Sequence, residues 1–415
     1  MHAYLPRALA FAILSTLATA ADWPQFRGPG GTATSADKGT PVTWSGTSSI
    51  VWKTELPGAG TSSAIAVGPR IFLTAYSGWN VPGQPGGSQE ELKREVLCLN
   101  RSNGKILWKA DMPSKLPEQD RIRDGHGYAS STPACDGQRV YVFFGKSGVF
   151  ALDLNGKVLW KADVGEGLNG WGSAASPVLH GNLLFINASV ESESLIALDK
   201  NTGKEVWRAR GIKESWNTPV VVATPAGKAE LVVAIFGKVL GFDPEKGTQL
   251  WSCETKIPWY MVPSLVAEKG IVYCIGGRNG GGALAIKAGG RGDVEPLWRG
   301  RKGSNVSSPV LHEGHLYWAS DSQPIVTCTN ATTGEMIYEE RLQRAEQFYP
   351  SPVLADGKLY YLTRAGQVFV VAAKPKFELL ATNKFDERAV FNACPAIADS
   401  RLLIRSDRWL YCVGK

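Results

Sequence analysis

Aromatic, basic and amide side chains recur at one position of a repeating pattern in this chain, just before each of several short apolar strands. Aromatic and arginine side chains are over-represented in binding hot spots, and rings mixed with polar groups also suit stacking on sugars. We therefore expect a binding surface on one face, although some rings could instead wedge between the strands. The predicted binding residues are Arg123, His126, Tyr128, Trp171, Trp216, Trp259, Tyr260, Arg301, Asn305, Phe348, Tyr349 and Phe391.

Motifs for catalysis are absent from the sequence. It holds no Gly-x-Ser-x-Gly nucleophile turn, no phosphate-binding Gly-rich loop and no His-Glu-x-x-His pair. His312 and His315 fall in a hairpin turn, where they are expected to face water rather than a metal ion. The glycine-rich residues 276–282 lead into a strand and not into the helix that a dinucleotide site needs. The sequence therefore predicts no catalytic residue and no metal site.

Glycan hydrolysis stays open at this point, because it needs only two carboxylates across a cleft. The sequence does not place the candidate carboxylates relative to one another. They are Asp124, Glu166, Glu214, Glu346 and Asp386.

The elements that would position these residues are short strands in a repeat. Each unit opens at a proline or its substitute, and the openings are Ala64, Pro133, Pro177, Pro219, Pro263, Pro309, Pro352 and Pro395. Their separations of 69, 44, 42, 44, 46, 43 and 43 residues match the roughly 40 to 45 residues of a four-stranded propeller blade. The pattern predicts an all-β, eight-bladed propeller of four-stranded antiparallel blades.

A tryptophan marks the end of most units. Trp52, Trp108, Trp160, Trp207, Trp251 and Trp298 occupy equivalent places, where Tyr338 and Leu380 stand in the remaining units. A large ring on an outer strand can bury about 150 to 250 Å². We assign these six tryptophans to packing between blades.

The last unit ends after three strands, at Tyr411-Cys412-Val413. Residues 50–53 supply an apolar strand that could complete it, which would close the ring and remove the exposed edges. The predicted organisation is a signal peptide over residues 1–20, an extension over 21–49 and one propeller over 50–415.

The beginning of the chain resembles a secretory signal. Arg7 precedes the apolar residues 8–18, and Ala18-Thr19-Ala20 suits cleavage. The run is too short to span a membrane. We expect a secreted, periplasmic protein that is not membrane-spanning and is monomeric.

Charge and cysteine content add two limits. The formal charge is +7, but basic and acidic residues alternate, which argues against a nucleic-acid partner. The seven cysteines form no Cys-x-x-Cys pair. We expect them to be buried thiols, with Cys98, Cys328 and Cys412 at matching third-strand positions. A single disulfide is the alternative.

Two sets of residues resemble the pyrroloquinoline-quinone-like (PQQ-like) β-propeller repeat family over nearly all of the mature chain. One is the Ala-x-Asp…Gly-x-x-x-Trp unit, as in residues 197–207, and the other is the opening Trp-Pro-Gln-Phe-Arg-Gly-Pro at 23–29. The opening is similar to that of exported propellers of planctomycete-type bacteria. The resemblance implies either a scaffold similar to the assembly factor BamB or a quinoprotein dehydrogenase.

The dehydrogenase branch implies a quinone cofactor (PQQ), calcium and a disulfide between adjacent cysteines, and this chain has no Cys-Cys pair. We therefore predict a non-catalytic exported scaffold without cofactor that binds an envelope protein or polysaccharide through its aromatic rim. The alternative is a PQQ- and calcium-dependent alcohol or sugar dehydrogenase. Two loops, residues 76–95 and 111–127, are expected to cap part of the channel and shape specificity.

Overall fold

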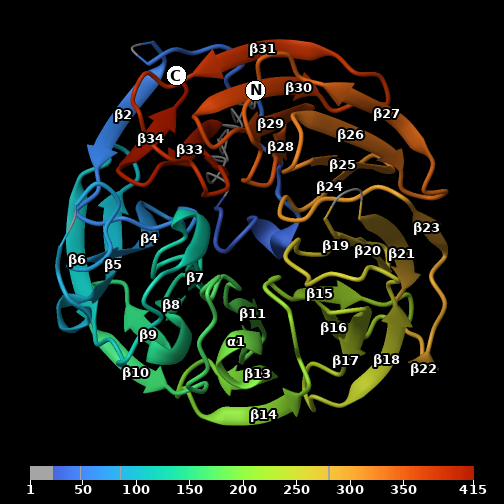
Figure 1. Ribbon diagram of the computed structural model, residues 1–415, viewed down its shortest axis with the longest axis horizontal. Helices are drawn as coiled ribbons and strands as arrows, with labels where there is room; N and C mark the ends of the chain where they lie inside the picture. The colour runs from blue at the N-terminus through green and yellow to red at the C-terminus, as the bar shows by residue number, and fades with distance from the viewer. Residues whose placement is uncertain (1–21, 47, 85, 279–280) are drawn as a thin grey trace, which may run out of the picture.

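Eight four-stranded antiparallel sheets, arranged like propeller blades around a central axis, make up the described part of the chain (Figure 1). The computed structural model describes residues 22–46, 48–84, 86–278 and 281–415. The predicted all-β, eight-bladed fold is confirmed. The predicted signal peptide, residues 1–20, lies outside the described residues.

Each of the first four blades runs outward from its inner strand in chain order. Blade 1 is β3 (Ile65–Val67), β4 (Arg70–Ser77), β5 (Lys93–Asn100) and β6 (Ile106–Met112); blade 2 is β7 (Ala134–Cys135), β8 (Arg139–Phe143), β9 (Val149–Asp153) and β10 (Val158–Ala162); blade 3 is β11 (Val178–His180), β12 (Leu183–Ala188), β13 (Ser194–Asp199) and β14 (Glu205–Arg210); blade 4 is β15 (Val220–Ala223), β16 (Ala229–Ile235), β17 (Lys238–Phe242) and β18 (Gln249–Glu254), extended by the parallel β22 (Gly292–Asp293).

The other four blades follow the same plan, and blades 7 and 8 each include one strand from the N-terminal segment. Blade 5 is β19 (Val266–Glu268), β20 (Ile271–Gly276), β21 (Gly282–Lys287) and β23 (Trp298–Gly300); blade 6 is β24 (Val310–His312), β25 (His315–Ala319), β26 (Ile325–Asn330) and β27 (Met336–Arg341); blade 7 is β28 (Val353–Ala355), β29 (Lys358–Leu362), β30 (Gln367–Ala372) and β31 (Leu379–Lys384), with the parallel β1 (Thr34–Ser35); blade 8 is β32 (Ala396–Ala398), β33 (Arg401–Arg405), β34 (Trp409–Val413) and β2 (Ile50–Glu55).

Helices in the described residues are limited to single turns. They are η1 (Pro29–Gly31), η2 (Gln89–Glu91), η3 (Arg123–Gly125), η4 (Gly145–Ser147) and α1 (Ser189–Ser192). No helix in the described ranges is long and apolar enough to cross a membrane.

The middle strands of a blade are buried on both faces, because each blade packs between two others. Every residue of β12 is buried, whereas the outer strand β14 leaves Glu205 and Val206 exposed. A continuous apolar run is what a strand buried on both faces requires. The core accordingly forms clusters that join neighbouring blades: one holds Phe72 of blade 1 together with Val140 of blade 2.

Five of the six predicted packing tryptophans donate their indole N–H to a backbone carbonyl of the next blade. A Cβ on Gly203 would lie 2.5 Å from the Trp160 ring, so this turn residue must be glycine for contact as well as for its φ of +73°. This geometry supports a role in packing the blades together. The pairs are Trp52 with Arg101 (3.2 Å), Trp108 with Leu154 (3.0 Å), Trp160 with Lys200 (3.0 Å), Trp207 with Pro244 (2.8 Å) and Trp298 with Ala331 (2.8 Å).

The junction between blades 4 and 5 is built differently. Trp251 is fully buried but donates to the carboxylate of Glu230 in its own blade, at 2.8 Å. The same carboxylate accepts the backbone N–H of Gly289 in blade 5, at 3.0 Å. Leu380, in the equivalent place of blade 7, is 38% exposed and does not bury as the rings do.

The ring closes between the two ends of the chain. Strand β2 pairs antiparallel with β34, with Lys53 opposite Tyr411 and Thr54 opposite Leu410. Figure 1 shows β2 in blue beside β34 in red. The predicted completion of the last blade by residues 50–53 is confirmed, and the strand extends to Glu55.

Residues 23–35 cross the end of the central channel at which the inner strands finish. Trp23 pairs with Ala66 of blade 1, and the carbonyl of Pro24 accepts the N–H of Cys135 in blade 2 at 2.8 Å. On the other side, the carbonyl of Ala33 accepts the N–H of Leu354 in blade 7, at 2.8 Å. Figure 1 shows this blue segment at the centre of the ring. The channel is therefore closed at that end.

An inner hydroxyl ring joins the eight blades around the channel. In seven steps, the backbone N–H of one ring residue donates to the side chain of the corresponding residue in the next blade, at 2.9 to 3.2 Å. The thiol of Cys394 contacts Ser63 and completes the circle. Its members are Ser63, Thr132, Ser176, Thr218, Ser264, Ser308, Ser351 and Cys394.

All seven cysteines are free thiols. Cys98, Cys328 and Cys412 lie buried on the third strands β5, β26 and β34 of their blades, as the repeat predicts.

Candidate functional site

The open end of the channel forms a cavity of about 150 Å³, which we call the mouth cavity. Its wall comes from the segments that enter the inner strands of blades 2 to 7, which is the position singled out in the sequence. The loops between the second and third strands of blades 5 and 6 add Arg278 and Asp321. The mouth cavity is lined by His126, Trp171, Ala174, Trp216, Tyr260, Val262, Arg278, Asn305, Val306, Asp321, Gln347 and Tyr349.

Three aromatic rings on one side of the mouth cavity hold one another in place. The Tyr260 ring centroid lies 5.5 Å from that of Trp216 and 6.2 Å from that of Trp171. Trp216 also donates its indole N–H to the carbonyl of Gly172 at 2.8 Å. Aromatic surfaces fixed in this way stack on a ligand at little cost in side-chain entropy.

The opposite side of the mouth cavity is polar. His126 Nε2 and the Tyr349 hydroxyl share a hydrogen bond of 2.6 Å. The backbone N–H of Asn305 donates to Asp321 Oδ1 at 3.0 Å, which orients the Asp321 carboxylate. Among the described residues, no donor reaches the buried Oδ1 of Asn305.

Six of the predicted binding residues therefore meet at the mouth cavity, and two others support it. Trp259 packs behind Tyr260 with a centroid distance of 4.9 Å, and Arg123 lies over the Trp171 ring at 5.2 Å. The six are His126, Trp171, Trp216, Tyr260, Asn305 and Tyr349.

Four predicted binding residues do not line the mouth cavity. Phe348 and Phe391 are fully buried, because the Phe348 ring packs against Tyr361 and Phe369 and the Phe391 ring packs against Phe385 and Tyr411. Tyr128 is 6% exposed and packs edge-on against Tyr76. Arg301 is exposed but lies outside the cavity lining. The three aromatic residues are thus buried in the core rather than exposed on the rim.

An outer groove of about 460 Å³ continues from the mouth cavity between blades 5 and 6. It shares Arg278, Asn305 and Asp321 with the mouth cavity. Farther out it is polar, with Ser322 and Gln323 from the loop after β25, and an ion pair between Lys302 and Glu339 at 3.2 Å. The sequence did not indicate this groove, although the glycine-rich loop supplies Gly277 to it.

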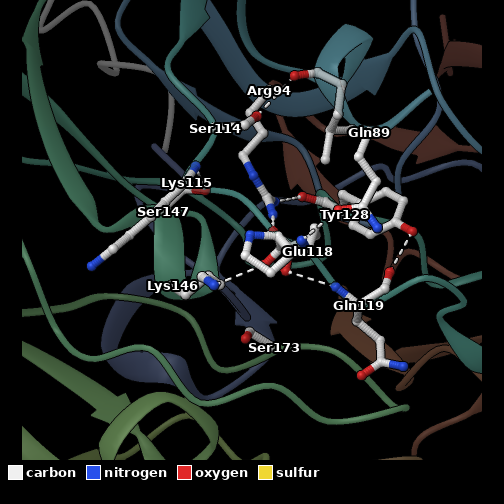
Figure 2. A network of polar contacts seen from close by, with 12 residues as sticks. Gln89, Arg94, Ser114, Lys115, Glu118, Gln119, Tyr128, Lys146, Ser147 and Ser173 are labelled. Carbon is white, nitrogen blue, oxygen red and sulfur yellow. Dashed lines mark hydrogen bonds and ion pairs between the residues drawn. The ribbon is translucent and has the colours of Figure 1, made fainter. Parts of the chain in front are cut away.

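A buried ion pair fixes the loop that carries His126 (Figure 2). The Arg94 guanidinium pairs with the Glu118 carboxylate, and both side chains are more than nine-tenths buried. Gln89 Oε1 accepts the N–H of Glu118 at 2.8 Å, and Lys146 donates to the carbonyl of Pro117 at 2.8 Å. The two loops at residues 76–95 and 111–127 are thereby held against each other and against blade 2.

Burial shifts the ionisation of this cluster. Desolvation lowers the pKa of Arg94, an effect that the neighbouring Glu118 opposes. On the blade 3 side, burial raises the pKa of Glu191 to about 7, although the Ser173 hydroxyl donates to its carboxyl group. The cavity between these groups measures about 30 Å³, space for one or two waters. The cluster therefore supports the mouth cavity and has no room for a substrate.

The donor set of the mouth cavity does not fit a quinone cofactor with calcium. Calcium takes six to eight oxygen ligands, several from carboxylates, whereas Asp321 is the one carboxylate in the cavity lining. Pyrroloquinoline quinone is a tricarboxylate, and Arg278 is the one Lys or Arg in the lining. Within the described residues, no group of three or more His, Cys, Asp or Glu side chains could hold a metal ion.

Among the described side chains, paired carboxylates of a glycosidase do not meet there either. Of the candidate carboxylates, Glu166, Glu214, Glu346 and Asp386 do not line the mouth cavity, and the side chain of Asp124 lies outside the described part of the structure. Glu166 pairs with Lys115 at 2.8 Å on the surface and is 74% exposed.

A known protein family matches most of the propeller. The family model described as outer membrane protein assembly factor BamB matches residues 45–209 and 149–376. The chain belongs to the BamB family. The expected PQQ-like, BamB-like propeller is thereby confirmed.

Curated relatives of this BamB-family chain carry different names. It is 25% identical over 333 residues to a tetrathionate hydrolase of Acidithiobacillus ferrooxidans, with 71% of this chain and 61% of that protein covered. It is 22% identical over 289 residues to the BamB of Burkholderia pseudomallei, with 66% and 64% covered. The chain thus spans less than two thirds of the length of either relative.

Solved structures share the fold at low identity. BamB of Moraxella catarrhalis has a TM-score of 0.64 at 14% identity, with 88% of this chain and 97% of that one covered. A quinohemoprotein alcohol dehydrogenase of Comamonas testosteroni has a TM-score of 0.69 at 12% identity, with 96% and 82% covered. Both scaffold and dehydrogenase names therefore occur on this fold, which by itself decides neither function.

Proposed function

We propose that this BamB-family propeller is an exported, non-catalytic binding protein of the cell envelope, and that its mouth cavity binds the end of a polysaccharide chain. The observation that carries the proposal is the convergence of Trp171, Trp216 and Tyr260 with Asn305 and Asp321 around one cavity of about 150 Å³. Sugar rings present an apolar face for stacking and an edge of hydroxyl groups that donate and accept hydrogen bonds.

The form of the surface favours a glycan over a folded protein. A protein partner of standard size needs about 800 Å² of surface on each side, whereas the aromatic rings here line a small concave cavity. Buried acceptors with unmet capacity, such as Asn305 Oδ1, suit a ligand rich in hydroxyl donors.

The outer groove supplies room for further sugar units. It begins at Arg278, Asn305 and Asp321, the residues that it shares with the mouth cavity, and continues outward with polar side chains. A chain end in the mouth cavity would place its next units along this groove. The sugar-binding positions then change from aromatic in the mouth cavity to polar in the outer groove.

A protein ligand is the second candidate, and a specific comparison favours it. Relatives in the same family are named as outer membrane protein assembly factors. In that case the aromatic mouth would receive a protruding peptide rather than a sugar.

Export is supported by the sequence and by the family. The apolar residues 8–18 with the following Ala18-Thr19-Ala20 suit a cleaved secretory signal, and the name of the matching family refers to the outer membrane. We place the protein in the periplasm on this basis.

The test is a titration of the purified protein with cellotetraose, xylotetraose, chitotetraose and maltotetraose, followed by tryptophan fluorescence and calorimetry. Trp171→Ala removes one stacking face and should weaken binding of the preferred sugar about tenfold, the effect of about 1.4 kcal/mol. Trp409→Ala is the matched control, because this half-buried tryptophan of blade 8 does not line the mouth cavity.

Binding of none of the four sugars, together with capture of an unstructured outer-membrane protein by the wild type and not by Trp171→Ala, would replace the glycan with a protein ligand. Equal weakening by both variants would remove the mouth cavity from the proposal.

A further inference from the structure

The central channel continues below the mouth cavity as a dead-end chamber of about 100 Å³, which we call the inner chamber. Phe26, from the segment that closes the channel, forms part of its lining. Six residues of the inner hydroxyl ring line it: Ser63, Thr132, Thr218, Ser264, Ser308 and Ser351. The mouth cavity and the inner chamber share His126, Trp216 and Tyr349, so they are connected.

Several hydroxyl groups of the inner chamber are hydrogen-bond donors with no acceptor among the described residues, whereas those of Thr61 and Ser130 donate to the carbonyl of His126. The hydroxyl oxygens of Thr132, Thr218, Ser264, Ser308 and Ser351 each accept a backbone N–H from the neighbouring blade. In the described part of the chain, no carbonyl or carboxylate accepts the hydroxyl hydrogens of Thr132, Thr218, Ser264 or Ser308. No Asp or Glu side chain lines the chamber. The chamber therefore offers several donors and no negative charge.

A buried cation, Arg27, lies beside the ring, outside the set of residues that line the inner chamber. Arg27 is 2% exposed, and its guanidinium donates to the carbonyl of Gly31 at 3.1 Å and to that of Pro309, the residue after Ser308. Its Nη1 is buried without a hydrogen-bond partner, and no described carboxylate pairs with it. Burial lowers the pKa of Arg27 to about 10, and the nearby Cys394 thiol opposes this effect. The guanidinium thus stays charged at neutral pH.

We propose that the inner chamber binds a small oxoanion, held by the ring hydroxyl groups and stabilised by the buried charge of Arg27 beside the ring. A buried charge without a partner carries a desolvation cost of several kcal/mol, and an anion at the ring would offset it. An oxoanion has only acceptor atoms, which is what a chamber of unmatched donors requires. The anion contacts proposed here, the ring hydroxyl groups, differ from the proposed glycan contacts, although Trp216 lines both cavities, and the proposal does not depend on glycan binding.

The direct test is crystallography of the wild-type protein soaked in sodium selenate, with the selenium located by anomalous scattering. The proposal predicts a selenium peak in the inner chamber, with selenate oxygens within hydrogen-bond distance of Ser264 or Ser308. Density for water alone in the chamber of a selenate-soaked crystal would overturn it.

The solution test measures the melting temperature against sodium sulfate and against sodium glucuronate. Sulfate stabilises proteins in general, in proportion to its concentration, whereas a bound anion adds a rise that saturates. The saturating rise should be present in the wild type and in Cys394→Ser, which makes the ring entirely hydroxyl. It should be weaker in Arg27→Lys and absent in Arg27→Gln.

A rise with sulfate identifies a free oxoanion, and a rise with glucuronate alone identifies the carboxylate of a sugar acid. A saturating rise that Arg27→Gln retains in full, or no saturating rise in the wild type with either salt, would contradict the proposal. The crystallographic result stands even if Arg27→Gln fails to fold.

Discussion

Glu191 is a buried carboxyl group whose replacement by glutamine should change how the stability of the protein depends on pH. The residue lies in α1 at the blade 3 edge of the cluster, is 4% exposed and accepts a hydrogen bond from Ser173. Burial raises the pKa of Glu191 from 4.5 to about 7 in the folded state. Glutamine keeps the shape and can keep the hydrogen bond, but it has no proton to lose.

The sign and size of the effect follow from this pKa. Between pH 4.5 and 7 the folded protein binds the Glu191 proton more tightly than the unfolded chain does, so the free energy of unfolding falls as the pH rises through this range. A shift of about 2.5 pKa units corresponds to about 3 kcal/mol. Glu191→Gln should therefore match the wild type at pH 4 and exceed it by about 3 kcal/mol at pH 8.

The assay is urea unfolding of the wild type and of Glu191→Gln at several pH values, each followed by fluorescence. Glu193→Gln is the control, because Glu193 makes an exposed ion pair with Lys213 and should change the free energy of unfolding by less than about 1 kcal/mol. A difference between Glu191→Gln and the wild type that stays constant from pH 4 to pH 8 would refute the reasoning.

Two further predictions concern packing and the loops. Trp251→Ala should lower the free energy of unfolding by about 3 to 5 kcal/mol, because the ring is fully buried and Glu230 loses its indole donor. The control Leu380→Ala, on a side chain 38% exposed, should lower it by less than about 1.5 kcal/mol. Equal losses for the two variants in thermal or urea unfolding would contradict the packing role of Trp251. Deleting residues 81–88 should change the free energy of unfolding by less than about 1 kcal/mol, because Trp79 keeps its stacking on Tyr128 and Gln89 keeps its bond to Glu118. The same deletion should alter ligand binding. A large fall in melting temperature would show that the loop is structural.

The fold could be predicted from local signals in the sequence. A unit of about 44 residues is one blade, so its proline, turn glycine and tryptophan recur at fixed places, and the three-strand ending at Val413 required a partner strand such as residues 50–53. The predicted positions of Trp171, Trp216 and Tyr260 followed from the same register. These residues share a face because each blade enters the ring in the same way.

Other features depended on contacts between distant segments. The position of Phe348 and Phe391 just before an inner strand suits both a rim and a wedge, and their burial depends on the neighbouring strands. Asp321 and Arg278 reach the mouth cavity from loops that do not repeat. The Arg94–Glu118 pair joins two insertions that no register relates.

The inner hydroxyl ring was not predicted, although the sequence carries a signal for it. Seven of the eight members of the inner hydroxyl ring directly precede an opening proline or Ala64, the exception being Ser264, which follows Pro263; seven of the eight members are Ser or Thr. A small hydroxyl residue at that point can accept an N–H from the next blade, so the repeat itself specified the ring.

The most direct test of the mouth cavity as the ligand site is a crystal structure of the protein with the tetrasaccharide that binds best. The account predicts a terminal sugar ring stacked on Trp171 or Tyr260, with a hydroxyl group bonded to Asn305 or Asp321 and the next units in the outer groove. A tetrasaccharide bound on the outer strands or on the closed end of the channel, with the mouth cavity holding only water, would contradict it.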